Sequence, residues 1–282
     1  MNAGIAAHTA CVWEVLARKV GNVHPGAGFA DLDHRHFLHS AGALATALVE
    51  CERAGIGETI LRAVQLRRVV TPSNTNLGII LLLVPLAKSQ TRQELETLMA
   101  SLTIGDARCA FEAIRIASAG GMGDVAEQSV AEEPTTTLLE AMRLAANRDM
   151  IAKQYTTGFA DIFDFGVPHL LRAFELYGSV EAAILDCQLR WLAAFPDSLI
   201  ARKCGSMIAE EVQTRAESIL QDGGLSERAG RAALLLFDEY LRGDGNRLNP
   251  GTTADLVTAC LFIALRGSKL KLSDPFPWIV NN

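Results

Sequence analysis

Residues 179–195, with the sequence SVEAAILDCQLRWLAAF, show the pattern that decides the fold class. Apolar side chains recur at helical spacing, and Ser179 is placed to act as an N-cap. Similar periodicity covers most of the chain. Residues 79–84 have a strand-like composition, but their flanks favour a buried helix. We therefore predict an all-α fold, a single compact domain over residues 1–282 with about 11 to 13 helices.

The expected helices account for most of the sequence, and several have recognisable starts. Thr91 with Glu94, and more loosely Thr252 with Asp255, fit a capping box, and Ser226 fits an N-cap. The helices are expected at residues 6–20, 33–54, 57–70, 76–87, 91–102, 106–119, 137–146, 149–163, 168–177, 179–195, 199–221, 226–242 and 252–265.

Composition excludes several classes of protein. The 282 residues are 49% hydrophobic and 21% charged, which suits a globular core. The formal net charge of −6, without a basic run, argues against binding of nucleic acid or an anionic membrane. No apolar run reaches the roughly 20 residues that cross a bilayer, and no secretory signal is visible, so we expect a cytoplasmic protein. The six widely spaced cysteines are expected to be free thiols, most of them buried.

The first polar segment, Lys-Val-Gly-Asn-Val-His-Pro at 19–25, ends a predicted helix that carries Glu14. A plain helix C-terminus with a solvated lysine explains it about as well as a binding site does. In the functional interpretation, Lys19, Asn22 and His24 lie at the rim of a pocket and face an anion.

A second polar segment, Ser-Asn-Thr-Asn-Leu-Gly at 73–78, leads into a strongly apolar helix. One amide or hydroxyl would cap the helix, but Asn74, Thr75 and Asn76 offer more polar groups than a cap needs. Gly78 permits the close approach of a ligand or of another helix. The segment lacks the Gly-Lys-Ser/Thr of a P-loop.

Histidines cluster at His34, His36 and His39, but their spacing disfavours a metal site. Residues two apart diverge on a helix, and structural zinc normally takes four ligands. Asp31 and Asp33 are better explained as caps of the helix that follows.

The irregular segment near 120–134 is either a linker or a functional loop. Gly123 lies in its glycine-rich part. Asp124 and Glu127 are candidates for Mg²⁺, which usually takes only one or two carboxylates together with phosphate oxygens.

Three later segments also carry candidate groups. Asp149 lies four residues before Lys153, so a surface ion pair explains this pair at least as well as catalysis does. Arg202 and Lys203 follow a capping Asp197 by about one turn and suit a polyphosphate as well as solvent. The turn at 249–255 opens another helix, where anions bind favourably.

Taken in order, these segments resemble the triphosphoribosyl-dephospho-CoA synthase family over nearly the whole chain. The residues that carry the resemblance are Glu14, Lys19, Gly21, Asn22, Val23, His24, Pro25, Asp31, Phe37, Ser40, Asn74, Thr75, Asn76, Leu77, Gly78, Asp197, Ser198, Arg202, Pro250, Gly251, Ala254 and Asp255. The resemblance implies an all-helical transferase. It would move the 5-triphosphoribosyl group of ATP to the ribose 2′-hydroxyl of 3′-dephospho-CoA and release adenine.

The resemblance also implies roles for individual residues. Glu14 and Asp149 would be the carboxylates near the reacting sugar, and Asp124 or Asp197 would bind Mg²⁺. The substrate and nucleotide would contact Lys19, Asn22, His24, Asn74, Thr75, Asn76, Gly78, Gly123, Gln154, Ser198, Arg202, Lys203 and Gly251.

One departure leaves the acceptor open. The family's typical segment is Asn-Thr-His-Lys-Gly, whereas Asn76 and Leu77 replace its histidine and lysine here. This variant resembles a branch associated with tetrahydromethanopterin-type one-carbon metabolism. An enzyme of that cofactor's biosynthesis acting on a phosphorylated substrate is therefore one alternative, and a non-catalytic nucleotide-binding protein is another. Apolar residues 234–237 suit either the core or a homodimer interface.

Overall fold

A computed structural model describes residues 1–30, 32–118 and 132–276. The expected all-α class is confirmed. Extended pairing in the described residues is limited to two isolated bridges, His24 with Ala27 and Phe29 with Leu32. The predicted irregular segment near 120–134 lies mostly outside the described residues; its residues 132–134, and residues 135–137 after it, are non-helical.

The contacts divide the chain into two compact units, so the predicted single domain stays a prediction. The first unit comprises residues 1–12 and 35–161, and the second comprises residues 13–34 and 162–282. Helix α1 (Ala3–Leu16) contributes residues to both units.

The first unit contains a strongly apolar helix, α4, which packs against α3, α5 and α8. Residues 79–86 of α4 are all buried, and Tyr155 donates a hydrogen bond from its hydroxyl to the Leu81 carbonyl at 2.6 Å. The helices of this unit are α2 (His34–Glu50), α3 (Ile56–Val70), α4 (Leu77–Lys88), α5 (Arg92–Ala100), α6 (Ile104–Ser118), α7 (Leu138–Ala145) and α8 (Met150–Thr156).

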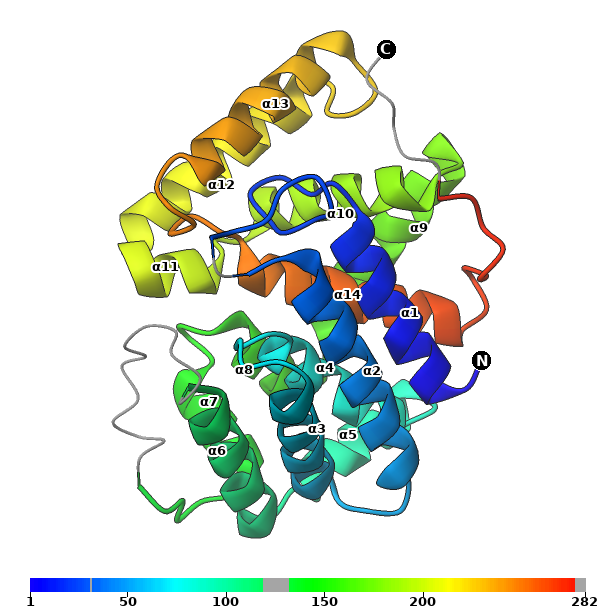
Figure 1. The fold of residues 1–282 in the computed structure, drawn as a ribbon, viewed down its shortest axis with the longest axis vertical. Coiled ribbons are helices and arrows are strands. Elements are labelled where there is room, and N and C mark those ends of the chain that lie inside the picture. Colours follow the sequence, from blue (N-terminus) through cyan, green and yellow to red (C-terminus); the bar gives the residue numbers. More distant parts are fainter. Residues whose placement is uncertain (31, 119–131, 277–282) are drawn as a thin grey trace. The chain divides into compact units, whose positions relative to one another are not determined.

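The second unit is centred on α10, which begins after Ser179 as predicted, with the Ser179 hydroxyl accepting from the Ala182 amide. Helices α9, α12 and α14 pack against α10, and Figure 1 shows α12 and α13 side by side. Its elements are a π-helix, η1 (Asp161–Gly166), and helices α9 (Val167–Tyr177), α10 (Val180–Ala194), α11 (Ser198–Cys204), α12 (Ser206–Gln221), α13 (Arg228–Arg242) and α14 (Gly251–Arg266).

Two predicted helices are interrupted. One of them forms two α-helices, which gives the described residues fourteen α-helices, more than expected, and the other is followed by a π-helix. The predicted helix at 199–221 breaks at Gly205, whose φ of +93° is a conformation that L side chains rarely adopt. The predicted helix at 149–163 ends before Gly158 and Phe159, with φ near +62° and +60°, and η1 follows.

The capping predictions were partly right. Thr91 accepts a hydrogen bond from the Glu94 amide as expected, but the Glu94 side chain accepts from the amide of Gln90, so the predicted capping box is only half formed. The prediction that Ser226 is an N-cap was wrong, because α13 begins after Glu227. The Ser226 hydroxyl instead forms a hydrogen bond with that of Tyr177 at 3.1 Å. The Thr252 cap was also wrong, because α14 begins at Gly251 and a side chain from another helix caps its first turn.

Candidate functional site

Lys19 follows α1, and its side chain folds back onto the C-terminal end of that helix. Its Nζ donates to the carbonyl oxygens of Glu14, Ala17 (3.3 Å) and Val23 (3.4 Å), and pairs with Glu14 Oε1 at 3.1 Å. An ammonium has three N–H donors, and these four oxygens account for them. The side chain is fully buried. The geometry therefore favours a structural role for Lys19 over the predicted contact with phosphate.

Glu14 is a buried carboxylate, and one of its oxygens, Oε1, forms an ion pair with Lys19. Burial raises the pKa of Glu14, and the charge of Lys19 opposes that rise. A buried carboxyl group with a raised pKa is a candidate for proton transfer, so the predicted role of Glu14 is chemically reasonable.

The segment after Lys19 is held by side chains from distant helices. Gln188 of α10 accepts from the Val20 amide at 3.1 Å and donates to the Val20 carbonyl at 2.9 Å. Asp238 of α13 accepts from the Gly21 amide at 2.6 Å. A Cβ on Gly21 would lie 2.7 Å from the Leu241 Cβ, so only glycine fits there.

Arg242 completes this support from α13. It pairs with Asp238 at 2.8 Å and donates to the carbonyl of Asn22 at 2.7 Å. The side-chain amide nitrogen of Asn22, Nδ2, donates to the Pro250 carbonyl at 3.3 Å. We call Glu14, Lys19, Asn22, His24, Asp238 and Arg242 the α1-end cluster. Its hydrogen bonds fix the backbone from which His24 projects.

His24 stands in a positive environment within the α1-end cluster. Burial, followed by the charges of Arg242 and Lys19, lowers the pKa of His24 from its ordinary 6.5 to about 4. Its Nδ1 accepts from the Gly26 amide at 3.1 Å, which requires that nitrogen to be unprotonated. At neutral pH the ring is therefore uncharged and can offer its Nε2–H to a ligand.

The neutral His24 predicts a pH dependence of stability. Above pH 6.5 the ring is uncharged in both the folded and unfolded states, so its full contribution is present. As the pH falls toward 4, the unfolded state takes up the proton first and stability decreases; below 4 the loss ends. The largest possible loss of stability from this protonation is about 3 kcal/mol, and the partial exposure of His24 reduces the expected loss to about 1–2 kcal/mol.

Urea unfolding at pH 7 and pH 4.5 measures this effect when the wild type is compared with His24→Asn. Asparagine keeps an acceptor near the position of Nδ1 and does not titrate. The wild type is expected to lose about 1–2 kcal/mol more than the variant over this interval. Equal losses in the two proteins would contradict the lowered pKa.

Asp197 joins the starts of α11 and α14. Its Oδ1 accepts from the amides of Leu199 (2.9 Å) and Ile200 (3.1 Å), and its Oδ2 accepts from the amide (2.7 Å) and hydroxyl (2.8 Å) of Thr253. Burial raises its pKa, while the bonds from Thr253 oppose the rise. Both oxygens are already engaged, so Asp197 does not fit its predicted role as a magnesium ligand.

Some residues near Asp197 take part in packing between helices, and others are exposed to solvent. The Ser198 hydroxyl donates to that of Thr252 at 3.0 Å, and a Cβ on Gly251 would lie 2.5 Å from Leu199 Cδ2. Gly251 thus packs closely against Leu199, and its contact with substrate stays a prediction. Arg202 and Lys203 are exposed in the last turn of α11, and their contact with phosphate stays a prediction.

In the first unit, the segment at 73–76 carries buried polar atoms without partners. The hydroxyls of Thr75 and Ser40 are hydrogen-bonded to each other. Asn74 Oδ1 and both side-chain polar atoms of Asn76 are buried without a hydrogen-bond partner. Asn76 has a φ of 60° and a ψ of 14°, and its side chain does not cap α4. Gly78 lies in the first turn of that helix.

The other first-unit candidates lie around α8. Asp149 caps α8 through Oδ1, which accepts from the amides of Ile151 (2.8 Å) and Ala152 (3.1 Å). Lys153 pairs with Asp161 at 2.9 Å, and Gln154 donates to the same carboxylate oxygen at 3.0 Å. Gln154 Oε1 is buried without a partner. Asp149 therefore has a structural role here, and its catalytic role stays a prediction.

The structure thus brings only some of the predicted residues together. Glu14, Lys19, Asn22 and His24 meet in the second unit, whereas the segment at 73–78 belongs to the first. Gly123 and Asp124 lie outside the described residues. Within the described ranges, no group of three or more His, Cys, Asp or Glu side chains is placed to hold a metal ion.

Sequence reasoning missed residues that only the packing reveals. Asp238 and Arg242 are distant in sequence from the segment that they support. Glu181, fully buried, pairs with Arg18 at 2.9 Å. Arg67 had a visible signal: it continues the apolar face of α3 after Ile60, Ala63 and Val64, where a charge is unexpected.

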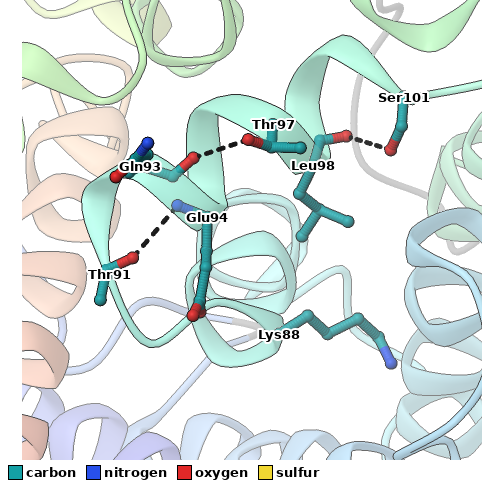
Figure 2. Close-up of a pocket in the computed structure, with 7 residues that line it drawn as sticks. All are labelled: Lys88, Thr91, Gln93, Glu94, Thr97, Leu98 and Ser101. Atoms are coloured by element: carbon teal, nitrogen blue, oxygen red, sulfur yellow. Dashed lines mark hydrogen bonds between the residues drawn. The ribbon is translucent and has the colours of Figure 1, made fainter.

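Figure 2 shows a surface hollow at α5 that none of the predicted residues lines. Its Thr97 and Ser101 hydroxyls donate to carbonyls of the same helix, at 2.9 Å in each case. Thr91 caps the helix start. These polar groups serve α5 itself, so we do not assign a substrate to this hollow.

Comparison with known proteins decides the family. The model of the ATP:dephospho-CoA triphosphoribosyl transferase family matches residues 2–274. The chain belongs to this family. The resemblance inferred from the sequence is therefore confirmed.

Individual members of the transferase family show the same relationship. A Pseudomonas putida protein named as a probable 2-(5″-triphosphoribosyl)-3′-dephosphocoenzyme-A synthase is 34% identical over 118 residues, which are 41% of each chain. A Pseudomonas savastanoi relative is 32% identical over 39% of this chain and 38% of its own. The matches span about two fifths of these relatives' length.

A solved structure extends the comparison to most of the fold. The crystal structure of an Archaeoglobus fulgidus protein assigned as a triphosphoribosyl-dephospho-CoA synthase aligns with a TM-score of 0.64 at 29% identity. The alignment covers 82% of this chain and 96% of the other. In the described residues, no helix is both long and apolar enough to cross a membrane.

Proposed function

We propose that this protein transfers the 5-triphosphoribosyl group of ATP to the ribose 2′-hydroxyl of 3′-dephospho-CoA or a related acceptor. The observation that carries this proposal is the family match over residues 2–274. The two substrates are small molecules, and we expect the reaction to take place in the cytoplasm.

The reaction exchanges one bond at the ribose anomeric carbon of ATP for another. The bond from C1′ to adenine N9 breaks, and the acceptor oxygen forms a new bond to C1′. The hydroxyl loses its proton to a base, and adenine leaves with a proton on nitrogen. Because positive charge develops at the sugar, a nearby carboxylate stabilises the transition state.

Glu14 is the described carboxylate best suited to this role. It is buried, and burial raises its pKa. Neutral His24, beside Arg242 and Lys19, would donate from Nε2 to a phosphate oxygen. Asp149 caps α8 through Oδ1, and a catalytic role for it remains a proposal that follows from the family resemblance.

The reaction implies Mg²⁺, which would neutralise charge on the triphosphate. Asp197 does not fit as a ligand because four hydrogen bonds engage its oxygens. Mg²⁺ that enters on the triphosphate needs only one or two protein carboxylates. Asp124 is the other candidate ligand for Mg²⁺.

Chromatography of the products tests the proposed function. Purified protein would be incubated with Mg²⁺ and ATP, with and without 3′-dephospho-CoA. Adenine that appears only with dephospho-CoA supports both the reaction and the acceptor. Slow adenine release without it supports the ATP half and leaves the acceptor open. No adenine in either case would overturn the proposal and favour the one-carbon or non-catalytic alternatives.

Glu14→Gln tests the proposed role of this carboxylate in the same assay. Glutamine keeps an acceptor for Lys19 but removes the charge, so adenine release is expected to fall about 100-fold. The rate is measured where unfolding curves show the variant folded. Glu217→Gln, on the exposed face of α12, is the matched control. Unchanged turnover in Glu14→Gln would exclude Glu14 as the reacting carboxylate.

A further inference from the structure

Arg67 is a buried cation with an unsatisfied donor. It lies on the apolar face near the end of α3 and is 1% exposed. Its Nη1 donates to the carbonyl of Ser73, whereas Nη2 is buried without a hydrogen-bond partner. A buried unsatisfied charged donor is costly, so this nitrogen is expected to bind something else.

The charge of Arg67 is not balanced within the described residues. Burial lowers its pKa, and the like charge of Arg68 lowers it further, with no acidic group contributing. An arginine cannot escape this cost by deprotonation. A negatively charged group would therefore be favoured beside it.

The neighbouring asparagines add donors and acceptors to the same place. The Ser73 carbonyl accepts from Arg67 and, at 3.0 Å, from the Thr75 amide, which ties this arginine to the 73–76 segment. Asn76 is 6% exposed, and neither of its side-chain polar atoms has a partner. Asn74 Oδ1 is a third such atom.

The backbone of this segment also favours an anion. Asn76 precedes α4 in a left-handed conformation, and its own side chain does not cap the first turn of that helix. Free amides at a helix start attract negative charge. The hydroxyl pair of Ser40 and Thr75 holds the segment to α2. Asn74, Leu77 and Gly78 are half-buried and form the accessible edge.

We propose that Ser40, Arg67, Asn74, Thr75 and Asn76, the α4-start cluster, bind a phosphate group of a phosphorylated sugar. The phosphate oxygens accept hydrogen bonds from Arg67 Nη2, from the side-chain amide nitrogen of Asn76 and from the first backbone amides of α4. The asparagine amide oxygens accept from a sugar hydroxyl. The identity of this ligand rests on the proposed function, whereas the need for an anion rests on Arg67 itself.

Calorimetric titration with inorganic tripolyphosphate tests the site without requiring turnover. Arg67→Met is expected to weaken the binding that depends on this site by about 10- to 100-fold, the usual range for a buried charge-assisted hydrogen bond. Arg68→Met is the matched control, because its exposed side chain carries the same charge and also donates to a loop carbonyl, that of Pro72 at 2.9 Å. Arg68→Met is expected to retain wild-type affinity.

A second variant guards against a folding defect in Arg67→Met. Asn76→Asp has nearly the same shape and adds the missing negative charge to the cluster. It is expected to stay folded and to lose tripolyphosphate affinity to a similar extent. Wild-type affinity in either Arg67→Met or a folded Asn76→Asp would overturn the site, as would absence of binding in the wild type. Adenine release tests the proposed function separately, because intact binding without adenine release would count against that function and not against the site.

Discussion

Replacing Lys19 by methionine is expected to destabilise the second unit by about 3–5 kcal/mol, the cost of leaving one partner of a buried ion pair alone. Glu14 is 4% exposed and would lose the ammonium 3.1 Å from Oε1. The carbonyls of Ala17 and Val23 would lose the same donor. Because Lys19 holds the end of α1, the segment through His24 should also loosen.

Urea unfolding followed by tryptophan fluorescence measures this loss, since Trp191 is buried in α10 of the same unit. Lys271→Met is the control, because Lys271 is exposed in that unit. The double variant Glu14→Gln with Lys19→Met should recover part of the stability, as expected for residues in direct contact. Unchanged unfolding together with weaker ATP binding would restore the original prediction that Lys19 contacts phosphate.

Asp197→Ala is expected to lower the free energy of unfolding by about 3 kcal/mol. Loss of an N-cap typically costs about 1 kcal/mol, and stranding the buried donors of Thr253 adds about 2 kcal/mol. Asp197 is 2% exposed, so water does not readily replace these bonds. The effect should exceed that of a simple cap because one carboxylate serves both α11 and α14.

The same fluorescence experiment measures this change, with Asp222→Ala as the control at an exposed position in the same unit. A magnesium titration separates the two interpretations of Asp197. If it bound Mg²⁺, the cation would stabilise the wild type more than Asp197→Ala. An equal response, with the variant about 3 kcal/mol less stable at every concentration, is the expected result.

The helical class and many helix ends could be predicted because their causes are local. Periodic apolar residues and Ser179 define the start of α10, and the Thr91 hydroxyl caps α5 as expected. Gly205 was the visible weakness in the predicted helix at 199–221, but a glycine alone does not state its φ. The family was also recognisable, because the order of short motifs survives without knowledge of their contacts.

The roles of the polar residues were less predictable, because a side chain's role depends on partners brought from elsewhere in the chain. Sequence marked Lys19 and Asp197 as ligand contacts, whereas the fold surrounds them with protein donors and acceptors. It passed over Arg67, whose place on the apolar face of α3 was visible in the sequence, but whose unpaired Nη2 beside the 73–76 segment is known only from the fold.

The sequence by itself determined the all-α class, the main helices and the family, since helix propensity, periodicity and motif order are properties of neighbouring residues. Only the tertiary structure decided which polar groups find partners within the described residues and which buried ones do not. Burial and hydrogen bonding between distant segments set both the pKa of His24 and the unpaired atoms of Asn76.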